Sequence, residues 1–424
     1  MEATRPKSRA VIGGRKGLDA SRPPLRYMGT KRALAPRVRD AVLSLGPLRG
    51  RTADLFSGMG SVASVLAPER PVLTNDHLSF TTAFARARFI DYPRRSPPTV
   101  ITALLSSFLR VSRDLDERFA RERHAERRAL AGGRRALDRF MAETRHVGNS
   151  THRKRQAEAA SKRDGAESYS LVTLYFAGGY FSYQQATRLD ALRYAIDHVE
   201  FGHSLEREWV LAAWVAAAGA IINAPGHSAQ FLKPTSDGTA ARIARTWRRD
   251  PWAVFMDRLA ALQPAGTRSW RQGNLVRNED ALDLIESASL DTVSVVYADP
   301  PYTKDHYSRF YHVYETLYRY DYPTSSGEGR YRHDRPCTGF SLLTRVEQEF
   351  RRLFEVLASR RIPLVLSYPS EGLLQKAGVG TEALLSEYFA LTSHVGIDGL
   401  HSTLGASSGS NTKPTQENIY VCRP

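Results

Sequence analysis

The chain has 424 residues, 42% of them hydrophobic, with 60 Lys and Arg against 44 Asp and Glu and a formal net charge of +16. This apolar content excludes a disordered protein, and the length predicts two or three domains of about 150 residues each. Its two cysteines, Cys337 and Cys422, cannot build a disulfide framework or a four-cysteine zinc site. We therefore expect a reducing, cytoplasmic location, and the positive surplus favours a polyanionic partner.

The longest apolar stretch, residues 209–224, is rich in alanine and shorter than the ~20 residues that cross a bilayer. It predicts a buried helix, so we exclude a membrane span. The N-terminus has no signal-peptide pattern.

The basic residues gather in two segments. Residues 1–26 have seven basic and two acidic side chains, and their glycines and prolines predict a flexible basic arm over residues 1–24. Residues 110–164 have 16 basic and nine acidic side chains with few aliphatic ones. This second segment is either a charged linker or surface helical hairpin, which we favour, or a direct contact for nucleic acid.

Strands and helices alternate in two parts of the chain. Residues 51–56 predict a short strand, 61–67 a helix and 71–74 a second strand, and the apolar runs 291–297 and 362–367 are typical of a parallel sheet. This alternation predicts a doubly wound α/β domain. Between these parts, residues 184–200, 205–222 and 247–262 have helical patterns. We therefore expect a catalytic domain over 25–94 and 266–424, interrupted by a helical insert over 95–265.

A glycine-rich turn follows the first predicted strand. In Asp54-Leu55-Phe56-Ser57-Gly58-Met59-Gly60-Ser61, two glycines let the backbone approach a ligand, and the next helix offers unpaired N–H groups. The segment lacks the third glycine of the dinucleotide fingerprint and the Lys of a phosphate-binding loop. It predicts either an ordinary turn or a site for a different nucleoside.

Asp76 follows the second predicted strand, about 20 residues after the glycines. An acid at this place in such folds holds ribose hydroxyls, although an Asp before a helix is also a good N-cap. Its place at a strand end favours the ligand.

The most specific motif is Asp299-Pro300-Pro301-Tyr302, at the end of the apolar strand. Open α/β sheets have their chemistry at this edge, and two prolines fix the backbone, so the carbonyls point in set directions. A carboxylate, a fixed carbonyl and an aromatic ring suit a planar base with an amino group. The alternative is a proline-rich turn closed by a packed tyrosine. No pair of histidines, including His306 and His312, has metal-ligand spacing with a third partner, so we expect no metal site.

Over most of residues 25–424 these motifs resemble the SAM-dependent N6-adenine DNA methyltransferases of the DNA adenine methylase type. Arg26 to Lys31, including Tyr27, resembles the N-terminal SAM motif, although Thr30 replaces a common glycine. Asp54 to Ser61 resembles the glycine-rich SAM motif, Asp76 the ribose acid and Asp299 to Tyr302 the catalytic motif. The segment Asn278 to Ala281, with Asp280, loosely resembles the acidic position that contacts the cofactor adenine.

The resemblance implies a SAM-binding fold with a mainly parallel sheet and a helical target-recognition insert, acting on double-stranded DNA. It implies that Tyr27, Asp54, Phe56, Gly58 and Gly60 help to bind SAM and that Lys31 pairs with its carboxylate. The target adenine would leave the duplex and stack on Tyr302, while Asp299 and the Pro300 carbonyl accept its amino hydrogens.

Further segments resemble the branch of this family in which the target-recognition insert precedes the catalytic motif. They predict DNA or substrate contacts for Tyr180, Phe181, His227, Gln230 and Tyr307. Taken alone, the aromatic pair is more typical of a core, the histidine of a turn, and the tyrosines from 307 on of a packed helix face. Modification of self DNA beside partner restriction or phage-defence proteins is the expected role. Methylation of RNA adenine or cytosine N4, and a non-catalytic DNA-binding protein, remain open.

Overall fold

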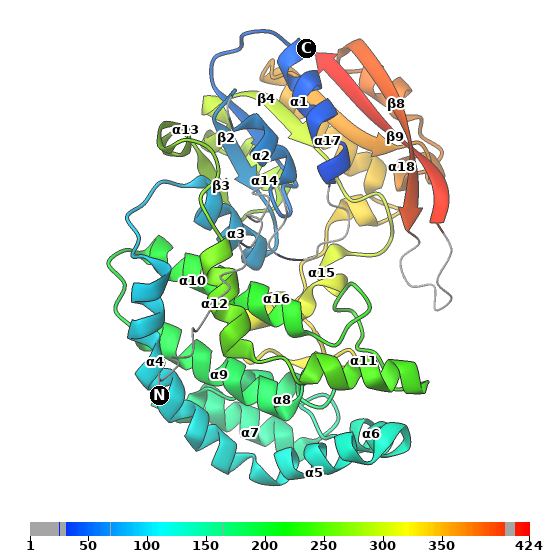
Figure 1. Cartoon of the computed structure of the whole chain (residues 1–424). Coiled ribbons are helices and arrows are strands. Elements are labelled where there is room, and N and C mark those ends of the chain that lie inside the picture. Colours follow the sequence, from blue (N-terminus) through cyan, green and yellow to red (C-terminus); the bar gives the residue numbers. More distant parts are fainter. Residues whose placement is uncertain (1–24, 26–30, 68, 164, 403–411) are drawn as a thin grey trace, which may run out of the picture.

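The structure is a computed structural model, and it describes residues 25, 31–67, 69–163, 165–402 and 412–424. A seven-stranded sheet with the order β3-β2-β1-β4-β7-β9-β8 forms one half of the described chain, and helices form the other (Figure 1). The predicted basic arm, residues 1–24, and the predicted SAM contact Tyr27 lie outside the described residues.

Five neighbouring strands are parallel: β3 (Leu275–Arg277), β2 (Val72–Asn75), β1 (Arg51–Asp54), β4 (Val293–Ala298) and β7 (Leu364–Pro369). They are short and almost entirely buried, as expected for a parallel sheet covered on both faces. The register sets Asp54 opposite Tyr297, so the ends of β1 and β4 lie side by side.

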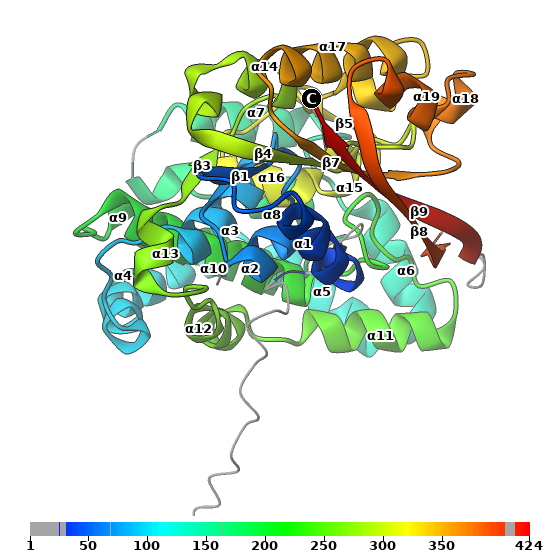
Figure 2. The ribbon, with the colours of Figure 1, turned by 90° about the horizontal axis from the view of Figure 1, so that it is seen from above.

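Helices cover both faces of the sheet (Figure 2). On one face α14 (Ala281–Glu286), α17 (Val346–Ser359), α18 (Leu373–Lys376) and α19 (Thr381–Ser386) bury one set of strand residues, among them Ala53, Leu73 and Val296. On the other face α1 (Ala35–Ser44), α2 (Ser61–Leu66), α3 (Ser79–Phe89) and α13 (Arg268–Gln272) bury the alternate set, with Val72 and Val295. Because successive side chains of a strand point to opposite faces of the sheet, the same apolar runs contribute to both cores.

The predicted α/β class is confirmed, and the four predicted strands correspond to β1, β2, β4 and β7. In two of them the start moves: residues 288–292 form a 3-10 turn before β4, and β7 begins at Leu364. The sheet also has strands that the sequence analysis missed, namely β3 and the antiparallel pair β8 (Ala390–Ser402) and β9 (Thr412–Arg423). β3 is too short for a pattern, and β8 and β9 carry mixed polar residues.

Between α3 and α13 the described chain is helical, with bounds as follows: α4 (Pro97–Arg118), α5 (Ala120–Ala131), α6 (Gly133–Glu143), α7 (Thr151–Ser161), α8 (Leu171–Phe176), α9 (Tyr183–His198), α10 (Ser204–Ile221), α11 (Asp237–Trp247) and α12 (Pro251–Ala261). The arginine-rich segment forms α5, α6 and α7, and α5 packs against α6. The assignment of residues 95–265 to DNA recognition stays a prediction. Among the described helices, none has the length and apolar character that a bilayer crossing requires.

Two helices follow the catalytic motif, α15 (Tyr307–Phe310) and α16 (His312–Arg319), and α16 packs on α3 and α10. The short strands β5 (Ser325–Ser326) and β6 (Tyr331–Arg332) pair beyond them. This segment therefore connects the sheet half to the helical half.

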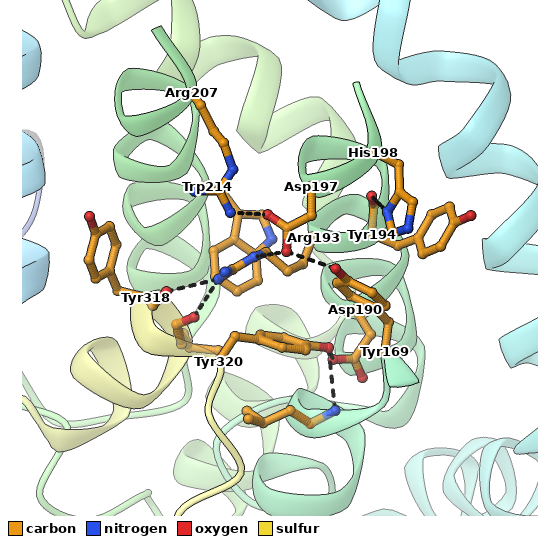
Figure 3. Close-up of polar contacts among 12 residues, drawn as sticks. Tyr169, Asp190, Arg193, Tyr194, Asp197, His198, Arg207, Trp214, Tyr318 and Tyr320 are labelled. Atoms are coloured by element: carbon orange, nitrogen blue, oxygen red, sulfur yellow. Dashed lines mark hydrogen bonds and ion pairs between the residues drawn. The ribbon is translucent and has the colours of Figure 1, made fainter. Parts of the chain in front are cut away.

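A buried polar network fixes that connection (Figure 3). The Asp190 carboxylate on α9 accepts hydrogen bonds from Val172 N at 2.8 Å and Thr173 N at 2.9 Å, and from the Tyr320 hydroxyl. The Arg193 guanidinium donates to the carbonyls of Leu317 and Tyr318 and to Asp197. Because these charged groups are buried with full sets of partners, they specify how α9 meets the end of α16.

Candidate active site

A pocket lies at the carboxyl ends of β1, β2 and β4 and encloses about 980 Å³ of space, part of it open to solvent. Of the residues that the sequence analysis selected, those that line it are Lys31, Asp54, Phe56, Gly58, Asp76, Asp280, Asp299 and Tyr307. Segments separated by more than 200 residues thus meet in one place.

The glycine-rich turn has the left-handed backbone that glycine allows. Gly58 has φ of 48° and Gly60 φ of 70°, and Gly60 caps the start of α2. The Gly58 N–H donates to Asp76 Oδ2 at 2.8 Å. A Cβ on Gly60 would overlap the Phe89 ring. Gly60 does not line the pocket, so its glycine serves packing and turn geometry, whereas Gly58 faces the pocket.

Asp54 ends β1, and its carboxyl group is buried beside the pocket. The side chain is 2% exposed, and Oδ1 has no hydrogen-bond partner among the described residues. Burial, followed by the charges of Asp299 and Asp76, raises the pKa of Asp54 well above its usual value. The charges of Asp54, Asp76 and Asp299 therefore repel one another in this pocket, and a positively charged ligand would relieve that repulsion.

Asp76 is held by backbone donors at the end of β2. Its Oδ2 accepts from Gly58 N, and its Oδ1 accepts from Leu78 N at 2.9 Å, just before α3. Burial raises its pKa, and these N–H groups partly oppose that rise. Of the two expectations for this residue, the helix cap is not formed, because the N-cap of α3 is Leu78 and it has no side-chain cap. Asp76 does face the pocket, and its bond from Leu78 N belongs to the turn before α3.

Asp280 lies across the mouth of the pocket. Its Oδ1 accepts from Leu282 N at 2.9 Å and caps α14, and its Oδ2 lies 3.8 Å from His77 Nδ1. The Asn75 side chain holds the segment before α14 in place. Its amide group donates to the carbonyls of Leu55 and Glu279, and its Oδ1 accepts from Glu279 N.

Asp299 comes directly after β4, and an ion pair holds it. Lys31 Nζ lies 3.0 Å from Asp299 Oδ1 and 3.1 Å from Glu417 Oε2, with all three side chains no more than 15% exposed. Burial raises the pKa of Asp299 to about 6, Glu417 adds to the rise, and Lys31 opposes it. Burial lowers the pKa of Lys31, but the two carboxylates more than offset it, so the ammonium stays charged.

The family resemblance implies that Lys31 pairs with the carboxylate of SAM, and this contact stays a prediction. In the structure the Lys31 ammonium pairs with two protein carboxylates. Glu417 was missed, because nothing in the sequence of residues 412–423 indicates a strand that returns to this site. Glu417 does not line the pocket, whose wall also has residues that were not expected there, among them His306 and the segment Pro336 to Thr338.

The remaining catalytic candidates surround Asp299. Pro300 is buried next to it, and Tyr302 is 8% exposed, with its ring centroid 5.6 Å from Lys31 Nζ. Tyr302 is not among the residues that line the pocket, whereas Tyr307 is. Stacking of a base on Tyr302 stays a prediction, and it requires this ring to become more accessible when substrate enters.

Tyr180 and Phe181 require a correction. Both are fully buried in the helical core and have no surface to offer to a base. The Tyr180 hydroxyl donates to the Ala229 carbonyl at 3.0 Å, so it supports the loop that carries His227 and Gln230. Both side chains therefore pack in the core, which is the more typical place for such an aromatic pair.

His227 and Gln230 lie outside the pocket, on a loop attached to α15. Ser228 N donates to the Phe310 carbonyl at 2.8 Å, and the His227 ring packs against Phe310 with centroids 5.2 Å apart. His227 is half-buried and Gln230 is exposed. A DNA contact by either stays a prediction. No metal-binding group of three or more His, Cys, Asp or Glu exists within the described part of the chain.

The mainly parallel sheet, covered by helices on both faces and with a pocket at its carboxyl edge, has the fold of the SAM-dependent methyltransferases. The family resemblance of the motifs is confirmed: residues 248–360 match the family of D12 class N6 adenine-specific DNA methyltransferases. This segment includes Asp299 to Tyr302.

Two curated proteins are similar to the chain. It is 22% identical over 410 residues to modification methylase LlaI of Lactococcus lactis subsp. lactis, covering 93% of this chain and 54% of that protein. It is 30% identical over 199 residues to the type II methyltransferase M.FokI of Planomicrobium okeanokoites, covering 46% of this chain and 27% of that protein. The chain thus spans about half of the first relative and about a quarter of the second.

Proposed function

We propose that this protein is a site-specific DNA methyltransferase that transfers a methyl group from SAM to the N6 amino group of adenine. The observation that carries the proposal is the convergence of Asp54, Asp76 and Asp299 on one pocket beside the Asp299-Pro300-Pro301-Tyr302 motif. The family match of residues 248–360 supports the same activity.

The pocket fits SAM in charge and shape. Asp54 Oδ1, a buried acceptor with no partner among the described residues, suits the ammonium of the methionine part. Asp76 suits ribose hydroxyls, because each carboxylate oxygen keeps a lone pair after its backbone bond. Phe56 and Asp280 line the wall where the adenine ring would lie. Lys31 has three N–H donors and two carboxylate partners among the described residues, so a third N–H could reach the carboxylate of SAM.

When bound, SAM supplies an activated methyl group on a positively charged sulfur. Asp299 and the Pro300 carbonyl accept the two amino hydrogens of an adenine rotated out of the duplex. These bonds draw the nitrogen lone pair out of ring conjugation and direct it at the methyl carbon. When the N–CH3 bond forms and the S–CH3 bond of the donor breaks, positive charge would pass to the nitrogen, and the Asp299 carboxylate would stabilise it until one amino proton is lost. The correct positioning of the two reactants accounts for the rest of the rate enhancement.

The helical half would hold the DNA. The exposed face of α11 carries Arg242, Arg245 and Arg248, opposite the buried Ala240, Ile243 and Trp247. Figure 1 shows α11 and the β8–β9 pair on the same side of the molecule. Arginines on such a face suit phosphate contacts.

The relatives are named a modification methylase and a type II methyltransferase. By analogy, we propose that the protein modifies self DNA in restriction-modification or phage defence, in the cytoplasm and beside partner nucleases.

The test is transfer from radiolabelled SAM to unmethylated plasmid DNA, with digestion to nucleosides and chromatography. Label in N6-methyladenosine supports the proposal. Label in N4-methylcytosine, or transfer to RNA in preference to DNA, would reassign the substrate. Binding of SAM and DNA without product would indicate a non-catalytic protein.

A further inference from the structure

The antiparallel strand β9 brings Glu417 close to the catalytic motif. β9 pairs with β7 so that Glu417 is opposite Pro369, at the carboxyl end of β7. β7 is the neighbour of β4, whose end carries Asp299. The strand order therefore brings a residue seven positions from the C-terminus to the edge where the motif lies.

Lys31 bridges Glu417 and Asp299. Its Nζ lies 3.1 Å from Glu417 Oε2 and 3.0 Å from Asp299 Oδ1, and Lys31 is 9% exposed. A buried ammonium paired with Asp299 alone would neutralise the carboxylate that must accept the adenine amino hydrogens. A second carboxylate on the same ammonium shares its charge, so Asp299 keeps more of its acceptor strength.

We propose that Glu417 is a positioning residue, which shares the Lys31 ammonium with Asp299 and so holds Asp299 in place and keeps it a strong acceptor for the amino group. The inference rests on the proposed function. It adds a residue that does not line the pocket and that the family match of residues 248–360 does not include.

The surrounding charges agree with this role. Among the described residues, the titratable groups that act on Asp299 or line its pocket are Lys31, Glu417, Asp54, Asp76, His77, Glu279, Asp280, Tyr297, Tyr302, His306, Tyr307 and Cys337. Of the groups that act on the pKa of Asp299, Lys31 is positively charged and lowers this pKa. Glu417 is negatively charged and raises it. Removing the Glu417 charge therefore lowers the pKa of Asp299 and weakens it as an acceptor.

The test compares Glu417→Gln with the wild-type protein in single-turnover methyl transfer to DNA from pH 5 to 8. We expect a plateau rate about tenfold lower, the scale of one weakened charge-assisted hydrogen bond. We also expect the acid limb of the pH profile to move to lower pH, with SAM affinity unchanged. Glu417→Asp keeps the charge and should fall between the two proteins.

Glu387→Gln removes a carboxylate that pairs with Arg351 on the surface, and it should match the wild type in rate and profile. A purely structural role for Glu417 would lower the amount of active protein and leave the acid limb in place. An unmoved limb in Glu417→Gln, or in Glu417→Ala should the first variant not fold, would overturn the inference. If the wild-type protein transfers no methyl group, the proposed function itself fails, so the two failures are distinguishable.

Discussion

Asp76 accepts a hydrogen bond from the backbone N–H of Gly58 at 2.8 Å, which joins the end of β2 to the glycine-rich turn after β1. The same carboxylate accepts a hydrogen bond from Leu78 N in the turn that precedes α3. One side chain thus shapes the pocket wall and faces the place proposed for the ribose. The proposed binding of SAM and the shape of the glycine-rich turn are therefore coupled at Asp76.

Asp76→Ala should weaken SAM binding by about 10–100-fold, the loss expected when a charged hydrogen-bond partner is removed. Asp76→Asn keeps an acceptor for one backbone N–H and should lose less. Calorimetric titration with SAM would measure both. Equal SAM affinity in Asp76→Ala and the wild type would remove Asp76 from the binding site.

Gly60→Ala should destabilise the fold for two reasons. The residue has φ of 70°, which costs an alanine about 1–2 kcal/mol, and the new methyl group would overlap Phe89, which adds about 1–3 kcal/mol. Gly133→Ala is the matched control, since Gly133 has φ of 76° and open space where the new methyl group would lie. Urea unfolding should show the larger loss for Gly60→Ala, and equal losses would argue against the packing term.

The methyl-transfer rate should fall below a pH of about 6. Burial raises the pKa of Asp299 to about 6, and the ionised form is the proposed acceptor, so the active fraction is lost as the pH drops through this value. Single-turnover rates from pH 5 to 8 at saturating SAM would show a decline approaching tenfold per pH unit on the acid side. A flat profile would mean that the charge of Asp299 does not matter.

The arginines of α11 should contribute to the salt dependence of DNA binding. Each phosphate contact that is lost reduces the slope of log affinity against log salt by ~0.9. Arg242→Gln combined with Arg245→Gln should lower the slope by up to about 2. Arg352→Gln combined with Arg360→Gln, near α17, removes the same charge from the far face of the sheet and should have no such effect. The same slope for both pairs would exclude α11 as a contact.

The sequence predicted the parts of the fold that local patterns encode. β1, β2, β4 and β7 are apolar runs, and their ends place Asp54, Asp76 and Asp299 at one edge of the sheet, so their meeting there could be predicted from strand position. The roles expected for these acids also depended on the family resemblance. Glu417 could not, because its role depends on a strand pairing between distant segments. Tyr180 was wrongly expected to contact DNA, because an aromatic residue near a basic surface and an aromatic residue in a core cannot be told apart in the sequence.

The central claim is that Asp299 acts on the adenine and not on SAM. Its most direct test is single-turnover methyl transfer to DNA by Asp299→Asn, measured together with SAM binding on the same preparation. We predict SAM affinity within about threefold of the wild type, and a transfer rate lower by at least about a thousandfold, as for loss of a charge-stabilising group in an active site. Transfer at the wild-type rate, or loss of SAM binding together with transfer, would contradict this role.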